Sequence, residues 1–204
     1  MTAPTFILAS ASPARTKLLT DAGIGHRVIV SDVDEDAVTA AAGAPSPARM
    51  AMLLAQAKAE AVAATPSAAG ALVLGCDSVF EFDGVAYGKP WEPDVARERW
   101  RLMRGRTGLL HTGHWLVDGR GAAAGAGEVT SAEVTFADVS DAEIDAYVAS
   151  GEPLQVAGAF TIDGRAGAFI TSVAGDPHTV IGLSVSTLRR LLAAREVPIT
   201  DLWV

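Results

Sequence analysis

The stretch that decides the fold is Thr5-Phe-Ile-Leu-Ala-Ser-Ala-Ser-Pro-Ala-Arg15. Its first half, Thr5 to Ala9, is short and apolar, which predicts a buried strand. Ser12 and Pro13 then predict the start of a helix, because a serine side chain caps free backbone amides and proline suits the first helical position. The stretch therefore predicts a strand that leads directly into the N-terminus of a helix.

The rest of the chain continues this alternation of strands and helices. Gly23 can end the first helix in a left-handed conformation, and His26 to Ser31 alternates as a second strand. Further helices are predicted over Ser46 to Ala64, Pro93 to Arg104, Ser140 to Gly151 and Ser184 to Ala194. Further strands are predicted over Ala71 to Gly75, Leu109 to Val117 and Val129 to Ala137, with hairpins joining Val79–Phe82 to Val85–Tyr87 and Ala159–Ile162 to Ala168–Val173. We expect one α/β domain over residues 1–204, a mixed twisted sheet flanked by helices.

Composition excludes several classes of protein. The 204 residues are 50% hydrophobic and carry a net charge of −8, which is typical of a globular chain and argues against a broad nucleic-acid or anionic membrane surface. Apolar stretches fall far short of the roughly 18 to 20 residues of a membrane span. The single cysteine, Cys76, cannot form an intramolecular disulfide and is expected to be a buried small hydrophobe. We expect a cytoplasmic protein that binds neither nucleic acid nor membrane.

A local anion site is predicted at the first strand–helix junction. Ser10, Ser12, Arg15 and the free amides of the helix would converge on a phosphate. The alternative, an ordinary serine cap beside a solvated arginine, is about equally probable on this segment alone.

Lysine is rare in this chain, which has three lysines against thirteen arginines. Lys58 lies at the edge of an apolar helical stripe, and Lys89 follows a glycine after a hairpin. Each could offer a compact cation to a polyphosphate, although a lone lysine usually extends into solvent.

Carboxylates offer candidate metal or water ligands. Asp77 is expected at the end of a buried strand, where open α/β sheets place catalytic groups, although a turn cap is as common there. Asp32-Val-Asp34-Glu-Asp36 is usually a solvated loop, but its oxygens also suit Mg²⁺. His111 and His114 are three positions apart on an expected strand, so they should face opposite ways and share no metal.

Taken together, the motifs resemble the Maf family of nucleoside triphosphate pyrophosphatases, which are related in fold to the inosine triphosphatases. The matching segments follow one another along the chain: Ser10-Ala-Ser-Pro-Ala-Arg15, Asp34-Glu35, Ala57-Lys58-Ala59, Gly75-Cys-Asp77-Ser-Val, Gly88-Lys89-Pro90, Arg104-Gly-Arg-Thr107, Ala157-Gly-Ala-Phe160, Gly175-Asp176 and Val180-Ile-Gly-Leu183. No single motif is specific, but the ordered set is.

The resemblance implies a role for each matching residue. Ser10, Ser12, Arg15, Lys58 and Lys89 would hold the triphosphate. Glu35 and Asp77 would work with a divalent cation, Mg²⁺ or Mn²⁺, and Asp77 would be the general base. The resemblance also implies two lobes around a cleft and a cytoplasmic enzyme, often a homodimer. The enzyme would release a nucleoside monophosphate and pyrophosphate, in a house-cleaning role on non-standard, modified or pyrimidine nucleotides.

Base preference is left open by three departures from the family pattern. Ala14, Ser78 and Asp163 stand where the pyrimidine branch has arginine, threonine and glutamine, and where the 7-methyl-GTP branch favours tryptophan, glutamine and glutamate. Gly108 replaces a histidine that many members carry.

A second function class is a non-catalytic regulator of septum formation that binds a nucleotide or a protein. Retention of Asp77 beside the lysines favours the enzyme, because a carboxylate repels phosphate unless a metal intervenes.

Overall fold

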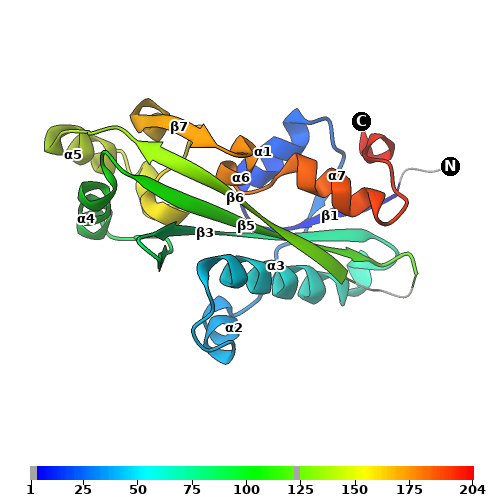
Figure 1. Cartoon of the computed structure of the whole chain (residues 1–204). Coiled ribbons are helices and arrows are strands. Elements are labelled where there is room, and N and C mark those ends of the chain that lie inside the picture. The colour runs from blue at the N-terminus through cyan, green and yellow to red at the C-terminus, as the bar shows by residue number, and fades with distance from the viewer. Residues whose placement is uncertain (1–3, 122–124) are drawn as a thin grey trace.

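The computed structural model describes residues 4–121 and 125–204, which form one mixed sheet with helices on both faces (Figure 1). The strands are β1 (Phe6–Ala9), β2 (Arg27–Val28), β3 (Leu72–Phe82), β4 (Val85–Tyr87), β5 (Thr107–Asp118), β6 (Gly125–Phe136) and β7 (Ile170–Ala174). The helices are α1 (Pro13–Asp21), α2 (Glu35–Ala41), α3 (Pro47–Ala63), α4 (Pro93–Met103), α5 (Asp141–Ala149), α6 (Pro177–Ile181) and α7 (Val185–Ala193). No helix in these ranges is long and apolar enough to cross a membrane. The predicted mixed α/β sheet is confirmed.

The strand order is β2-β1-β3-β5-β6-β7, with β4 also paired to β3. β1 runs parallel to β2 and β3, whereas the pairs β3–β5, β5–β6 and β6–β7 are antiparallel. The last pair between β1 and β3 joins Ala9 to Gly75, and the pairing of β3 with β4 covers only Phe80 to Phe82, with Tyr87 opposite Phe80. Within the described residues, β3 therefore has no strand partner on that edge between residues 76 and 79. This break in the sheet lies directly beyond the end of β1.

Helix α3 packs unusually close to one face of the sheet. Ser46 caps its N-terminus, and its buried face carries small side chains, among them Ala51, Ala55 and Ala59. Gly75 and Gly113 lie under it: a Cβ atom on Gly75 would stand 2.1 Å from the Ala55 carbonyl oxygen, and one on Gly113 would stand 2.3 Å from that of Ala51. Because real Cβ atoms are never that close to a carbonyl, this contact requires glycine on the strands.

Separate cores occupy the two ends of the long sheet. One end buries aliphatic side chains from β1, β3, α1 and α7, including Leu8, Leu74 and Leu188. The other end is an aromatic core in which Phe80, Trp100, Phe136 and Phe160 meet edge to face. Helices α4 and α5 cover this second end (Figure 1). The break in β3 lies between the two cores.

Several predicted boundaries were wrong. The strand expected over His26 to Ser31 shrinks to Arg27–Val28, and the acidic run continues into helix α2, which Asp34 caps. The expected strand Ala71–Gly75 is the first part of an 11-residue strand, because β5 pairs with β3 as far as Glu81. Asp77 therefore lies within a strand and not at its end, although it does lie beyond the end of neighbouring β1.

The hairpin expected over Ala159–Ile162 and Ala168–Val173 does not form. Residues Ala157–Ala159 make a 3-10 turn, in which Gly158 has φ 72° and lies against the Phe80 ring. Residues Arg165–Phe169 make another, and β7 then pairs with β6. The apolar side chains here enter the aromatic core from turns, so their pattern imitates a strand. The flexible connection expected over 119–127 includes residues 122–124, which lie outside the described residues, and β6 begins at Gly125.

Candidate active site

Arg15 is the centre of the junction between β1 and α1. Ser12 caps α1 by accepting the Arg15 amide, and the Ser12 amide donates to the Ser10 hydroxyl at 3.2 Å. Arg15 as a residue is 8% exposed, and its guanidinium donates to Ser10 Oγ at 3.0 Å, to Ser78 Oγ at 3.1 Å and to the Gly182 carbonyl at 2.7 Å. All three acceptors are neutral.

No carboxylate in the described part of the chain forms an ion pair with Arg15. A buried charge without a counter-charge is expensive, so it is usually paired or held for a ligand. Arg15 also has N–H donors beyond the three that these bonds use, since a guanidinium carries five. The arrangement therefore favours an anion at this junction.

Two contacts of Arg15 come from distant parts of the chain. Gly182 follows α6 with φ 119°, and a Cβ atom there would stand 3.1 Å from Arg15 Nε. Ser78 Oγ also contacts Thr112 Oγ1 at 2.9 Å, and Thr112 donates to the Thr179 carbonyl at 2.8 Å. Ser78, expected to influence base preference, thus holds the guanidinium. Sequence reasoning gave no role to Gly182, Thr112 or Thr179.

Lys58 joins two carboxylates on the other face of β3. Its ammonium lies 2.5 Å from Asp77 Oδ1 and 2.8 Å from Glu35 Oε1. The Lys58 and Asp77 side chains are only 11% and 12% exposed, whereas Glu35 is half exposed in the first turn of α2. The close packing of α3 on Gly75 brings Lys58 this near, because Lys58 precedes Ala59, which contacts Gly75.

The protonation of Asp77 reflects opposing influences. Burial raises the pKa of its carboxyl group, Lys58 and Arg15 oppose this by their positive charge, and Glu35 adds to it; the pKa lies above its ordinary value. A carboxylate of raised pKa is a better proton acceptor than an ordinary aspartate.

Asp77 and Ser78 link the two clusters. They are consecutive in β3, so their side chains point to opposite faces, one toward Lys58 and the other toward Arg15. Both lie in the part of β3 that has no strand partner on its β1 edge. The structure therefore brings Ser10, Ser12, Arg15, Lys58, Glu35 and Asp77 to one break in the sheet.

Lys89 is not in contact with this group. It lies in the exposed loop between β4 and α4, and its ammonium lies over the Trp91 ring. In the described residues no ion pair or hydrogen bond connects it to Arg15, Lys58 or Asp77.

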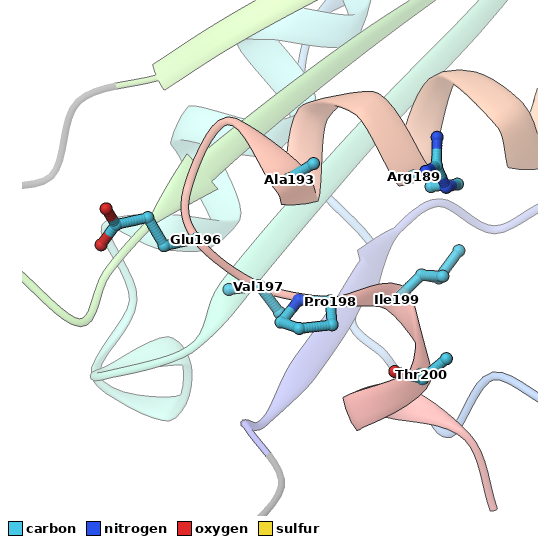
Figure 2. A pocket seen from close by; sticks show the side chains of 7 residues that line it. All are labelled: Arg189, Ala193, Glu196, Val197, Pro198, Ile199 and Thr200. Atoms are coloured by element: carbon cyan, nitrogen blue, oxygen red, sulfur yellow. The ribbon is translucent and has the colours of Figure 1, made fainter.

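Ala14 and Asp163 line a pocket of about 460 Å³ beside α1, together with Lys17, Leu18, Asp21, Ala22, His178, Ile181 and Val185. The two residues expected to influence base preference therefore do share a cavity next to the Arg15 junction, whereas Ser78 is not part of its lining. A second pocket of about 440 Å³, at the C-terminal end of α7, is lined by Arg189, Glu196 and their neighbours (Figure 2). It contains none of the predicted site residues.

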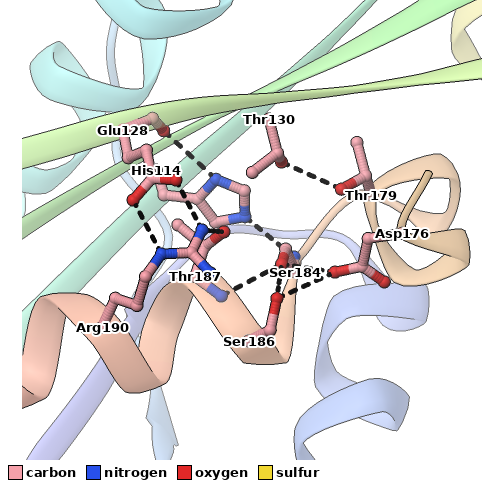
Figure 3. A network of polar contacts seen from close by, with 9 residues as sticks. All are labelled: His114, Glu128, Thr130, Asp176, Thr179, Ser184, Ser186, Thr187 and Arg190. Atoms are coloured by element: carbon pink, nitrogen blue, oxygen red, sulfur yellow. Dashed lines mark hydrogen bonds and ion pairs between the residues drawn. The ribbon is translucent and has the colours of Figure 1, made fainter.

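The turn that carries Gly182 is held by a polar network (Figure 3). Asp176 accepts the His178 amide at 2.9 Å and the Ser184 hydroxyl at 2.5 Å. Burial would raise the pKa of Asp176, but the hydrogen bonds from Ser184 and the His178 amide outweigh it and hold the pKa below its ordinary value. Thr130 and Thr179 also share a bond, at 2.9 Å. These contacts fix the carbonyl that holds Arg15.

His114 belongs to the same network. Its Nε2 accepts the Ser184 amide at 2.8 Å, and burial, the largest influence, lowers its pKa to about 4. His111 instead contacts Ser131 at 2.7 Å and Glu81 at 2.9 Å. The two histidines have separate partners, as strand alternation predicts.

Cys76 is fully buried, and burial raises the pKa of its thiol to about 12, so it is a neutral core residue as expected.

The fold and these contacts define a mixed α/β protein with a buried arginine and a buried lysine–aspartate pair beyond the carboxyl end of its first strand. The chain belongs to the Maf-like protein family, whose model matches residues 5–195. It is 56% identical to a nucleoside triphosphate pyrophosphatase of Leifsonia xyli, over 96% of this chain and 95% of that one. It is 54% identical to a nucleoside triphosphate pyrophosphatase of Streptomyces coelicolor, over 97% and 93%. A solved dITP/XTP pyrophosphatase of Mycobacterium abscessus covers 66% of this chain at 14% identity, with a TM-score of 0.35.

Proposed function

We propose that this protein hydrolyses nucleoside triphosphates to a nucleoside monophosphate and pyrophosphate. The observation that carries the proposal is that Asp77 and Ser78 are consecutive in β3. Asp77 therefore places a buried carboxylate on one face of the strand, and Ser78 holds the buried guanidinium of Arg15, which has no counter-charge in the described residues, on the other face. The carboxylate can accept a proton from water, and the guanidinium can bind phosphate. The names of the relatives agree with this reaction.

The carboxylates fit a divalent cation. Glu35 and Asp77 supply the hard oxygen ligands that Mg²⁺ and Mn²⁺ prefer, and Lys58 already marks a cationic position between them. Mg²⁺ usually takes one or two protein carboxylates and completes its shell with phosphates and water, so two carboxylates would be sufficient protein ligands. When bound, the cation would offset the charge of the phosphate oxygens.

The chain's own residues would divide the remaining work. Arg15, with the hydroxyls of Ser10 and Ser12, binds and orients the phosphates. Asp77 accepts a proton from the water that attacks the α-phosphorus, and its raised pKa suits that role. Lys58 holds Asp77 in place, and Lys89 binds the phosphates of the triphosphate that leave as pyrophosphate.

The pocket beside α1 is our candidate for recognition of the base. A small residue, Ala14, leaves room there, and Asp163 offers a carboxylate acceptor. Ala14 and Asp163 match neither the pyrimidine nor the 7-methyl-GTP pattern and so do not select one base. The substrates to examine therefore include non-standard, modified and pyrimidine nucleotides.

The test is pyrophosphate release from a panel of ordinary and modified nucleoside triphosphates with Mg²⁺ or Mn²⁺. We expect release together with the matching monophosphate, lost in Asp77→Asn while nucleotide binding persists. Asp118→Asn is the matched control, because Asp118 pairs with Arg120 at the end of β5, outside the site. Full activity in Asp77→Asn would overturn the base assignment. A folded protein that releases nothing from any nucleotide would favour the regulatory alternative.

A further inference from the structure

Trp91 is an exposed aromatic residue, and in the described residues the partner identified for its ring is a lysine. The residue is 58% exposed, and the Lys89 ammonium lies 5.1 Å from the centroid of the indole ring. Lys89 forms no ion pair in the described part of the chain. At this distance a cation is attracted to the face of the ring, and tryptophan is the best aromatic partner.

The backbone at Trp91 is strained. The Glu92 amide donates to the Pro90 carbonyl at 2.7 Å, which closes a three-residue turn around Trp91, whose φ is 61°. A γ-turn with positive φ is rare, and a bulky residue is unfavourable in this region. Strain of this kind is concentrated at functional sites. Burial does not explain a tryptophan here, because more than half of the residue is exposed to solvent.

The main chain on both sides of Lys89 is anchored. The Gly88 carbonyl accepts the Gly158 amide and the Arg99 side chain, Pro90 is buried, and the Trp91 amide donates to the Leu154 carbonyl at 3.0 Å. The main chain is therefore held on both sides of Lys89, and in the described residues the Trp91 indole is the one partner identified for the Lys89 ammonium.

We propose that Trp91 is a positioning residue for Lys89: the indole holds the ammonium in place before phosphate arrives. The proposal rests on the proposed function, in which Lys89 binds phosphate. A free lysine side chain samples many rotamers, and ordering it opposes binding. A contact that restricts those rotamers in advance reduces this penalty.

The position of the Lys89 ammonium over the Trp91 ring can be measured without any substrate. Reductive ¹³C-methylation converts lysine amines into dimethylamines that keep their charge, and the three lysines, with the N-terminal amine, give few NMR signals. Lys89, assigned with Lys89→Arg, should show methyl signals shifted upfield by the indole ring current. Trp91→Asn should abolish this shift, since asparagine tolerates the backbone conformation without the ring. Trp91→Phe should retain part of it.

Trp203→Asn is the matched control, because Trp203 is equally exposed, at 60%, and in the described residues has no cation over its ring. The Lys89 signal should stay shifted in this variant. An unshifted Lys89 signal in the unsubstituted protein, or one that Trp91→Asn leaves in place, would overturn the proposal.

Steady-state kinetics test whether the contact between Trp91 and Lys89 improves binding of the triphosphate. Trp91→Asn should raise KM for the triphosphate about two- to fivefold, equivalent to about 0.5–1 kcal/mol, with kcat nearly unchanged, and Trp91→Phe should restore most of the affinity. In a Lys89→Gln background the same substitution should have no effect. An equal rise in that background would show that Trp91 acts independently of Lys89 and would overturn the proposal.

Failure of the proposed function would look different. A protein without any turnover would refute the pyrophosphatase, and the positioning role would then be decided by titrating pyrophosphate into the methylated protein. The Lys89 signal should respond in the unsubstituted protein at lower concentration than in Trp91→Asn. Equal responses would overturn the role.

Discussion

Lowering the pH should destabilise this protein through His114. The imidazole is fully buried, and its Nε2 accepts the Ser184 amide, so the ring is neutral in the folded state. Its pKa falls from 6.5 to about 4, chiefly through burial. The unfolded chain therefore binds a proton between these values that the folded chain does not, and the stabilisation present above pH 6.5 is lost as the pH falls toward 4. At about 1.36 kcal/mol for each tenfold change in proton affinity, the loss is about 3 kcal/mol.

Urea unfolding between pH 4 and pH 7 measures this effect, with His114→Gln as the comparison. The variant should be less stable than the unsubstituted protein at pH 7 by about 1–2 kcal/mol, because a glutamine oxygen does not reproduce the position of Nε2 opposite the Ser184 amide and the packing of the ring is lost. That gap should close as the pH falls and reverse by about 1–2 kcal/mol near pH 4, since glutamine does not titrate and acidic groups elsewhere are common to both proteins. His26→Gln controls for loss of an imidazole near β2 and should keep the unsubstituted profile. Parallel profiles for the unsubstituted protein and His114→Gln would refute the reasoning.

Three further predictions concern the site and its support. Arg15→Lys keeps the charge but not the three-way reach of the guanidinium, so kcat/KM should fall about 10- to 100-fold, and unchanged kinetics would contradict the anion-site assignment. Gly75→Ala should lower the free energy of unfolding by about 3 kcal/mol or more, because α3 must move to make room for the methyl group. Denaturant unfolding measures this, and Gly121→Ala is the control because the space around Gly121 is open. Equal stabilities of the two variants would refute the close contact between α3 and β3. Trp100→Phe should cost about 1–3 kcal/mol in the same assay, because the Ala159 carbonyl loses its 2.8 Å donor, and a neutral result would refute that bond.

Local signals predicted much of the fold. Ser12, Ser46 and Ser140 each cap a helix as expected, because capping depends on residues within one turn. The length of β3 and the absence of the second hairpin could not be predicted in this way. They depend on pairing with β5 and on packing around Phe80, which join residues far apart in the sequence.

The candidate site also combines a part that local sequence signals predict with a part that depends on contacts between distant residues. The motif around Ser10, Ser12 and Arg15 is local, and its geometry follows from one strand–helix junction. The ion pair of Lys58 with Asp77 depends on how closely α3 lies on Gly75, and the Arg15–Gly182 contact spans 167 positions. Such contacts carry no local signature, so only the family resemblance brought Lys58 and Asp77 together before the structure did.

The central claim is that water attacks the α-phosphorus of a nucleoside triphosphate at the break in β3. Hydrolysis in ¹⁸O-labelled water, followed by mass spectrometry of both products, tests it most directly. The account predicts one ¹⁸O atom in the nucleoside monophosphate and none in pyrophosphate. Label in pyrophosphate, or release of orthophosphate with a nucleoside diphosphate, would contradict it.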